Sequence, residues 1–504
     1  MLITVDCLRA DHCGFYGYAR PTTPFLDSLA SESIVVPTAV VAGAPTYYSL
    51  PAMMASRMPL ALGRDVVGLA PDEDTLATTL HRAGYATAAF SAGNPYISTR
   101  FGYNRGFEAF HDFLDFDAGA TPGPNVANSL QDGHLRGTPN RWLKKSAQAV
   151  GLSYFYDELY FQYCARIAAP AIGSVNDLRK YPSADMVVES AESWLASIGS
   201  RPFFLWIHLM DPHHPYYPPA AAFRDLTGRS LPPARMRYLN EFWNRSDAGV
   251  DRLQKHKEAV VELYDAGIRW VDSQIARLVS GLQHSGHWGN CVFALTADHG
   301  EEFLEHGRRY HAPVSLTEEI ARVPLIFRVP GTQKVEHRAP HLGTQTARPS
   351  GAGMVFSHLH LAPTLLEILE VPPPPDFQGK SLWKRLQRGP WPGRDNDPVE
   401  SAIAECVYGC TNPLNEQTRL SPRLLCVREA RYKLVMRLEP GAVEEVYDVI
   451  SDPKEKSPLR GGGTAEIRRR LLLVAMEYIK TTSVGDRSAR LKFLLRDLRL
   501  KLHS

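Results

Sequence analysis

Two short segments of this 504-residue sequence carry acidic and imidazole side chains directly after an apolar run. Asp6 follows the first run, and Asp298 with His299 follows the second. In parallel α/β sheets, the functional side chains gather at the carboxyl ends of the strands. Two carboxylates that converge with an imidazole can hold a divalent cation. We therefore expect Asp6, Asp298 and His299 to form a metal site, although either carboxylate taken alone would also suit a helix N-cap.

A third polar segment follows the apolar run Phe203–Leu209 and contains His213 and His214. An imidazole has a pKa near ~6.5, so it can give a proton to a leaving oxygen at neutral pH. His213 and His214 are therefore rival sources of such a proton, and the alternative for either residue is a histidine that ties a loop.

The elements that must position these side chains alternate along the chain. Short apolar runs are separated by amphipathic patterns, which is typical of an α/β protein with a parallel sheet. Between Lys257 and Leu282, apolar residues recur at steps of three and four, which predicts a helix that packs on this sheet. The runs that we expect to form buried strands are Leu2–Val5, Ala86–Phe90, Phe203–Leu209, Cys291–Thr296 and Val323–Arg328.

A domain boundary is expected near residue 395, because prolines and glycines cluster just before it. Beyond it, the runs Leu424–Val427, Lys433–Arg437 and Glu445–Val449 predict short antiparallel strands. Within the final segment, residues 487–504 carry a basic amphipathic pattern, which suits either an anionic membrane surface or the protein's own surface. The expected parts are a catalytic domain over 1–395, a C-terminal antiparallel-sheet subdomain over 396–465 and a basic helical tail over 466–504.

Composition restricts the classes of protein to consider. Apolar residues make up 44% and charged residues 22% of the chain, which is ordinary for a globular protein. The net charge of +2 argues against a nucleic-acid partner. The seven cysteines have no metal-site or disulfide spacing, which favours thiols in a reducing compartment. No secretory signal is visible after Met1, so we expect a cytoplasmic location, with the membrane surface as an alternative.

Longer motifs surround the candidate site residues. They include the run Asp6–His12, the segment Asp211–His213, and Asp298–Glu301 followed by Glu305–Gly307. In this order, over residues 1 to about 455, they resemble the sulfatase family of the alkaline phosphatase superfamily. The resemblance implies an α/β fold: an alkaline-phosphatase-like sandwich whose central, mostly parallel sheet is flanked by helices. It also implies a smaller C-terminal α+β subdomain with an antiparallel sheet.

The nucleophile position departs from the family pattern. In sulfatases, a Cys or Ser that is oxidised to formylglycine opens a motif that closes on a proline, and Pro59 aligns with that proline. The nucleophile then falls on Thr46, while Tyr48 and Leu50 replace the motif's usual proline and arginine. We therefore expect no formylglycine. A metal-activated threonine hydroxyl remains a competent nucleophile; a competing alignment places Ser49 there, and Thr46 could also be an ordinary loop or helix-capping residue.

Two further positions gain a role from the resemblance. Cys7 stands where many sulfatases carry a second metal-binding aspartate, which tilts the expected ion towards manganese or zinc and leaves calcium and magnesium open. His311 matches a position where the family places a His or Lys that binds an anionic oxygen. His213 matches a residue that protonates the leaving oxygen or contacts the transferred group.

The expected function is a metal-dependent hydrolase of the sulfatase family that cleaves a sulfate or phosphate ester through Thr46. One alternative is a phosphoalcohol transferase, of the phosphoglycerol or phosphoethanolamine type, that acts on a glycan or lipid. Another is a catalytically silent binding protein. The expected partner is an anionic small-molecule, glycan or lipid-head-group ester bound between walls from residues 111–185 and 219–256, and the sequence leaves the oligomeric state open.

Overall fold

A seven-stranded sheet forms the centre of the protein in the computed structural model, which describes residues 1–115, 153–163, 173–332, 353–388, 400–439 and 441–482. Strand β1 lies in the middle and pairs in parallel with β6 on one side and β7 on the other. In spatial order the strands are β2 (Ile34–Val35), β11 (Leu325–Arg328), β7 (Phe293–Ala297), β1 (Leu2–Val5), β6 (Phe203–Leu209), β4 (Ala86–Ser91) and β5 (Ala109–His111).

The expected strand runs agree with this sheet, with one difference. The ranges of β1 and β6 are those that we expected, and β4 and β7 differ at their ends by one or two residues. The run Val323–Arg328 instead divides at Pro324, since proline has no N–H to donate to a strand ladder. Its first residue belongs to β10 (Arg322–Val323) of a separate small sheet, with β3 (Ala39–Val40) and β12 (Phe356–Ser357), and its end forms β11, antiparallel to β7.

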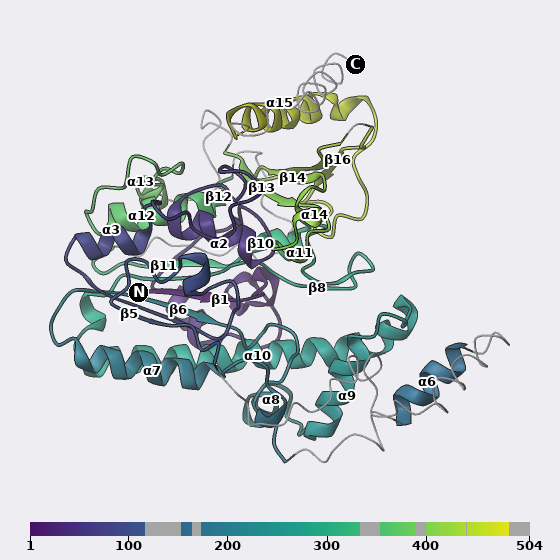
Figure 1. Cartoon of the computed structure of the whole chain (residues 1–504), viewed down its shortest axis with the longest axis horizontal. Coiled ribbons are helices and arrows are strands. Elements are labelled where there is room, and N and C mark those ends of the chain that lie inside the picture. The colour runs from purple at the N-terminus through teal and green to yellow at the C-terminus, as the bar shows by residue number, and fades with distance from the viewer. Residues whose placement is uncertain (116–152, 164–172, 333–352, 389–399, 440, 483–504) are drawn as a thin grey trace.

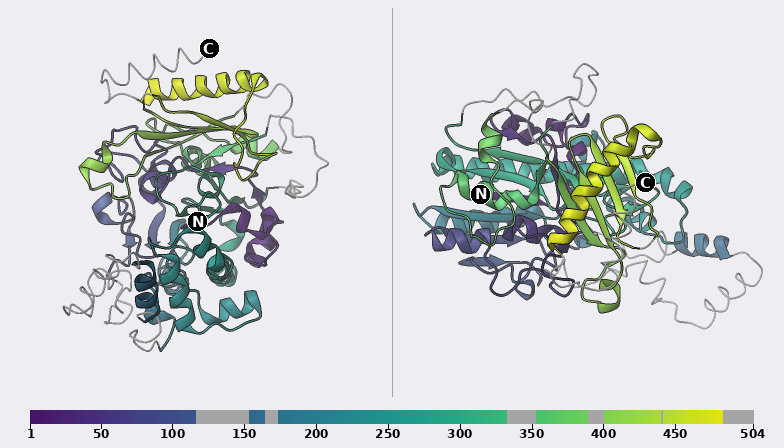
Figure 2. Two further views of the ribbon diagram at one scale, coloured as in Figure 1. Left: turned by 90° about the vertical axis from the view of Figure 1, so that its right-hand side faces the viewer. Right: turned by 90° about the horizontal axis from the view of Figure 1, so that it is seen from above.

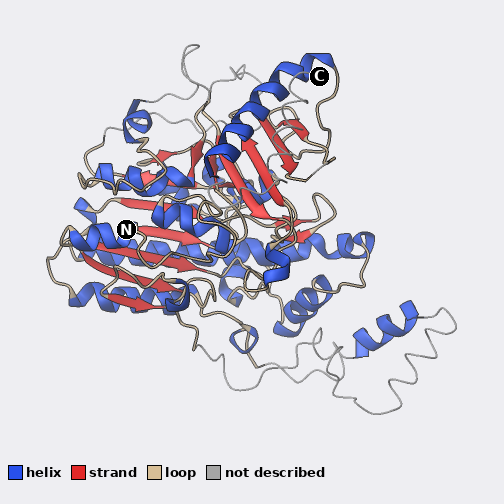
Figure 3. Ribbon diagram, turned by 45° about the horizontal axis from the view of Figure 1, so that its top comes forward, coloured by secondary structure: helices blue, strands red, loops and turns tan. Residues whose placement is uncertain are grey.

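Helices cover both faces of the central sheet, which explains why its strands are apolar on both sides (Figures 1 and 3). One face carries α1 (Pro24–Ala30), α7 (Ala184–Ser197) and α10 (Val250–His284). The other carries α2 (Thr46–Ala55), α3 (Leu76–Arg82), α12 (Leu361–Ile368) and α13 (Trp383–Arg388). The other α-helices among the described residues before 388 are α6 (Ser153–Tyr163), α8 (Ala220–Thr227), α9 (Pro233–Trp243) and α11 (Glu318–Ala321).

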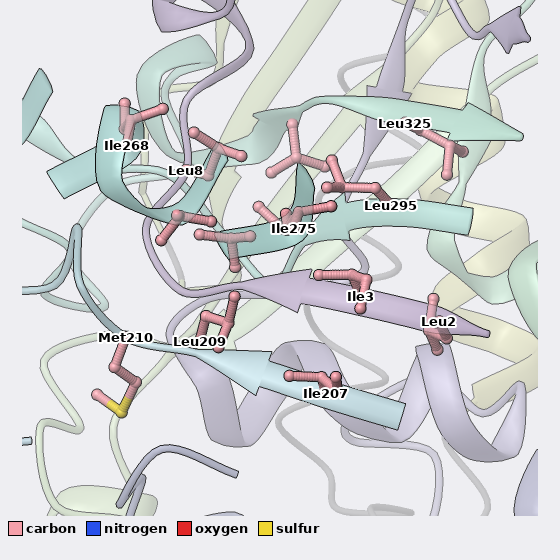
Figure 4. Close-up of a cluster of buried hydrophobic side chains, with 14 of the residues drawn as sticks. Leu2, Ile3, Leu8, Ile207, Leu209, Met210, Ile268, Ile275, Leu295 and Leu325 are labelled. Carbon is pink, nitrogen blue, oxygen red and sulfur yellow. The ribbon is translucent and has the colours of Figure 1, made fainter. Parts of the chain in front are cut away.

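The long helix α10 includes the predicted helix at Lys257–Leu282 and extends it at both ends. Its apolar stripe faces the sheet, and Figure 4 shows Ile268 and Ile275 in one buried cluster with Leu8 and Leu295. This packing fixes the segment that follows β1, because the Tyr264 hydroxyl on the same helix donates to the Cys7 carbonyl at 2.7 Å. The helix therefore helps to set the backbone around Asp6.

The C-terminal part forms an antiparallel sheet of four strands, as the sequence predicted, although its first strand was not anticipated. The strands are β13 (Ala402–Val407), β14 (Arg423–Arg428), β15 (Tyr432–Arg437) and β16 (Glu445–Asp448), with α14 (Glu416–Arg419) between the first two. Helix α15 (Ala465–Thr482) lies across this sheet (Figure 2) and buries Leu471, Leu472 and Ile479 against it. The first part of the expected tail thus shares a core with the sheet, and residues 483–504 lie outside the described ranges.

The six cysteines among the described residues are all buried and free of disulfides. No helix within the described ranges has both the length and the apolar composition needed to cross a membrane. The expected wall segment 219–256 forms α8, α9 and the start of α10. The other expected wall, 111–185, is described only over 111–115, 153–163 and 173–185.

A buried ion-pair network joins the C-terminal sheet to the rest of the molecule. The side chain of Lys433 on β15 is fully buried, with its Nζ 2.8 Å from Glu455 and 3.3 Å from Glu318 on α11. Glu318 also receives two hydrogen bonds from Arg428 on β14, both at 3.0 Å. These charges hold α11 against the sheet and compensate one another out of reach of water.

We expect Lys433→Met to lower the free energy of unfolding by about 3–5 kcal/mol, because it leaves Glu455 buried without its cation. Chemical denaturation followed by circular dichroism measures the change. The double variant Lys433→Met/Glu455→Gln should recover part of the loss, whereas Lys480→Ala, which removes an exposed pair, should change stability by less than about 1 kcal/mol. If Lys433→Met lowered the free energy of unfolding by less than about 1 kcal/mol, this ion-pair network would not contribute to stability as proposed.

Candidate active site

Asp6 and Asp298 meet at one edge of the central sheet because they follow the neighbouring parallel strands β1 and β7. Both side chains are fully buried. The backbone N–H of Cys7 donates to Asp298 Oδ1 at 3.3 Å, which holds the ends of the two strands together. The structure therefore brings together carboxylates that stand almost 300 positions apart in the sequence.

His299 completes this cluster with the lone pair of one ring nitrogen. Its Nδ1 lies 2.9 Å from the Gly300 carbonyl oxygen, which assigns the proton to Nδ1 and leaves Nε2 unprotonated. That Nε2 lies 3.5 Å from Asp298 Oδ2 and 3.8 Å from Asp6 Oδ1. Asp298 Oδ2 is buried and accepts no hydrogen bond from any described residue. The lone pair of His299 Nε2 thus faces an oxygen of each aspartate, an arrangement that a cation would stabilise and that fits a divalent metal.

His208 and Asn94 also contact Asp6, and the sequence analysis missed both. His208 Nε2 lies 3.3 Å from Asp6 Oδ2, and one ligand atom each of Asp6, His208 and Asp298 lie within 4.8 Å of one another. Asn94 Nδ2 donates to the same Oδ2 at 2.9 Å. Their signals were weak: His208 is the one imidazole in an apolar strand run, and Asn94 follows β4 much as Asp6 follows β1.

The environment favours the ionised form of Asp6. Burial alone would raise its pKa, but the charge of His213 and the hydrogen bond with His208 oppose burial, and the pKa lies well below its usual value. A carboxylate that stays charged in a buried place needs positive partners. Asp6 is therefore available as an anionic ligand at neutral pH.

Thr46 is the first residue of α2 and directs its hydroxyl towards this cluster. Its Oγ1 lies 3.3 Å from His299 Nε2 and 3.5 Å from Asn94 Nδ2. The amino end of a helix also favours negative charge, such as that of a bound anion. Ser49, the competing nucleophile, lies one turn further along α2, and its Oγ is buried without a hydrogen-bond partner among the described residues.

His213 and His311 lie on the other side of the cluster. The ring centroid of His311 is 4.4 Å from that of His299 and 5.0 Å from that of His213. Glu301 Oε1 lies 2.9 Å from His311 Nδ1, and Tyr216 donates to the other oxygen of Glu301 at 3.0 Å. Burial alone would lower the pKa of His311, but Glu301 reverses this and raises the pKa to about 9. His311 is therefore cationic at neutral pH.

His213 differs from His311 in its charge. Burial lowers its pKa from the usual value, although Asp6 opposes the shift. Its Nδ1 lies 2.5 Å from the His214 carbonyl oxygen, which fixes the ring. His214 itself packs on Tyr310, with ring centroids 4.5 Å apart, so of the two rivals it is His213 that lies beside His311.

Cys7 points into the same cluster from a left-handed backbone conformation, with φ of 61°. Its Sγ donates to Asp6 Oδ1 at 3.0 Å and lies 3.4 Å from His311 Nδ1. Burial and the charge of Glu301 raise the pKa of the thiol well above its usual value, so it is protonated at neutral pH. The site thus has a thiol at the position where, by the resemblance, many sulfatases carry a second metal-binding aspartate.

Comparisons with known proteins agree with this arrangement of the chain. The family model described as Sulfatase matches residues 1–371. An arylsulfatase of Clostridium perfringens is 25% identical over 420 residues, which cover 76% of this chain and 77% of that protein. A Delta 4,5-hexuronate-2-O-sulfatase of Bacteroides thetaiotaomicron is 28% identical over 191 residues, or 38% of this chain and 35% of that protein.

Solved structures agree as well. The phosphonate monoester hydrolase of Agrobacterium radiobacter has a TM-score of 0.62 to this chain at 17% identity, over 96% of this chain and 95% of that one. At that identity the likeness speaks for the fold alone, and it confirms the expected α/β sandwich with a C-terminal antiparallel sheet. The family match spans the central sheet and every residue of the acidic and imidazole cluster. This chain therefore belongs to the sulfatase family.

Proposed function

We propose that this protein hydrolyses a sulfate or phosphate ester, with Thr46 as the nucleophile and a divalent cation held by Asp6, Asp298 and His299. The observation that carries the proposal is the position of Thr46 Oγ1, 3.3 Å from His299 Nε2 at the head of α2. The same hydroxyl lies 3.5 Å from Asn94 Nδ2, which also donates to Asp6. The family membership supports an ester hydrolase, and the site residues extend that general assignment to a mechanism.

The donor set supports a borderline metal such as Mn²⁺ or Zn²⁺. It offers carboxylate oxygen and imidazole nitrogen, with Cys7 in place of a further carboxylate. Calcium and magnesium prefer sites built from oxygen alone. When bound, the cation supplies Lewis acidity, which lowers the pKa of a nearby hydroxyl and polarises the ester.

The chain's own residues account for the remaining steps. Thr46 loses its proton to solvent, and its Oγ1 forms a bond to sulfur or phosphorus while the bond from that atom to the alcohol oxygen breaks. His213, which binds a proton before the ester bond breaks, gives that proton from its imidazolium form to the departing alcohol oxygen. Cationic His311 pairs with an anionic oxygen of the transferred group, where negative charge is concentrated. Water then attacks the esterified Thr46, gives one proton to His213, and Thr46 leaves with another.

The substrate that we propose is an anionic glycan ester. The relatives in the comparison include an enzyme named for a hexuronate sulfate. Structural neighbours named phosphonate monoester hydrolases are the reason to test phosphorus esters as well. An acceptor alcohol in place of water would turn the same residues into a transferase. Turnover of 4-nitrophenyl sulfate, 4-nitrophenyl phosphate and bis(4-nitrophenyl) phosphate, each with and without an acceptor alcohol, separates these activities.

We expect Thr46→Ala to reduce kcat by about 1,000-fold or more, because loss of the nucleophile removes the covalent route. Thr46→Ser, which keeps a hydroxyl, should retain measurable turnover. Ser49→Ala is the matched control and should keep activity within a few-fold of the parent. The assay is release of 4-nitrophenol, and the nucleophile assignment fails if Ser49→Ala abolishes turnover while Thr46→Ala preserves it.

We expect Asp298→Asn to weaken Mn²⁺ or Zn²⁺ binding by more than 100-fold, since changes to groups that only support ligands already cost about 10–100-fold. Isothermal titration calorimetry on chelator-treated protein measures the dissociation constant. Asp251→Asn, at an exposed carboxylate on α10, controls for loss of charge elsewhere. Equal affinity in the Asp298 variant and the parent would place the metal somewhere other than this cluster.

A further inference from the structure

The segment Gly173–Pro182 approaches the active site and is held there by Arg179. One guanidinium nitrogen of Arg179 donates to the Tyr217 carbonyl at 2.8 Å, and another pairs with Asp211. Arg179 and Asp211 are both buried, so this attachment is shielded from water. Asp211 opens the loop that carries His213. The next two residues, Lys180 and Tyr181, are therefore fixed beside the proposed leaving-group acid.

Tyr181 forms a wall of the site between that loop and β4. Its ring meets the ring of His213 edge-on, with centroids 5.3 Å apart. On the other side it packs against Gly93, where an added Cβ would lie 3.6 Å from Tyr181 Cδ1 and 3.2 Å from Pro182 Cδ. Gly93 also has a φ of 73°, which a side chain would strain. The close approach of the two segments thus depends on a glycine next to Asn94.

The hydroxyl of Tyr181 is available to a ligand. Burial raises its pKa, and the charge of Asp6 raises it further, which shows that the phenol lies within electrostatic reach of the cluster and stays protonated. No hydrogen bond joins this hydroxyl to another described residue, and the residue as a whole is half-buried. A phenol of this kind can donate to an ester oxygen at the mouth of the site.

Lys180 adds an uncompensated positive charge further out. Its Nζ lies 5.2 Å from the centroid of the Tyr181 ring, the side chain is exposed, and it forms no ion pair within the described ranges. Burial is the largest cause that lowers the pKa of His214, and the charges of His213 and Lys180 lower it further. The ammonium of Lys180 therefore lies close to this loop. From His213 outwards, a substrate therefore meets an edge-on tyrosine and then a cation.

We propose that Tyr181 and Lys180 form a second subsite, which binds an acidic group on the alcohol part of the substrate. The inference rests on the proposed function, because His213 marks the side from which the alcohol leaves. In this subsite Tyr181 donates to the ester near the reacting centre, and Lys180 pairs with a carboxylate or a second sulfate or phosphate further out. The preferred substrates are thus esters with at least two negative charges.

Binding to Thr46→Ala protein loaded with Mn²⁺ tests the subsite without turnover. The probes are 4-carboxyphenyl sulfate, its neutral analogue 4-carbamoylphenyl sulfate and 1,4-phenylene bis(sulfate), together with the corresponding phosphates, and calorimetry gives each dissociation constant. We expect the two acidic probes to bind about five-fold more tightly than the amide, the upper range for a partly exposed ion pair. Which acidic probe binds better distinguishes a carboxylate partner from a second ester.

Variants in the same background assign this preference. Lys180→Ala should bring the acidic and amide probes within two-fold of each other, and Tyr181→Phe should weaken all probes by a similar factor. Lys255→Ala, at an exposed lysine on α10, should keep the full preference. The subsite is overturned if Lys180→Ala keeps the preference, or if the protein with Lys180 intact binds acidic and amide probes equally. Because these are affinities, a failure of Thr46 as nucleophile would appear separately, as residual turnover in Thr46→Ala.

Discussion

The convergence of lone pairs at the end of β1 and β7 is the constraint around which the site is organised. Asp6, Asp298 and the Nε2 of His299 lie buried beside one another, and only a strongly held scaffold can keep like groups so close. That scaffold is the central strand β1, paired on both sides and covered by helices on both faces. The same scaffold places His208 and Asn94 on Asp6 from β6 and from the end of β4.

His311 and His213 differ in charge because their rings have different partners and because burial affects their pKa values differently. Glu301 keeps His311 charged at neutral pH, whereas burial lowers the pKa of His213, whose Nδ1 lies against the His214 carbonyl oxygen and not a carboxylate. One imidazole is thus suited to hold an anion and the other to exchange a proton. The proposed subsite at Tyr181 lies beyond His213, on the side from which the alcohol leaves, and so away from the imidazole that holds the anion.

Much of the fold was predictable because local patterns and global packing agree. The apolar runs at β1 and β6 have the length of buried strands and are too short for typical helices. The apolar residues of α10 recur at helical spacing over many turns. Asp6, Asp298 and His299 could be selected because each follows such a run. His208, Asn94 and Tyr181 could not, since their importance comes from a neighbouring strand or loop. The division at Pro324 shows how one residue without an N–H redirects a continuous apolar run.

The position of β1 in the sheet also bears on how the molecule is made. Its two partners, β6 and β7, begin 201 and 291 residues after it along the chain, at Phe203 and Phe293 against Leu2. At a synthesis rate of roughly 5–20 residues per second, β1 waits about 10–40 s for its first partner to be made. During that interval a strand that is fully buried in the folded protein has no native neighbour. Nascent chains of this protein should therefore depend on chaperones until the far half of the sheet has been translated.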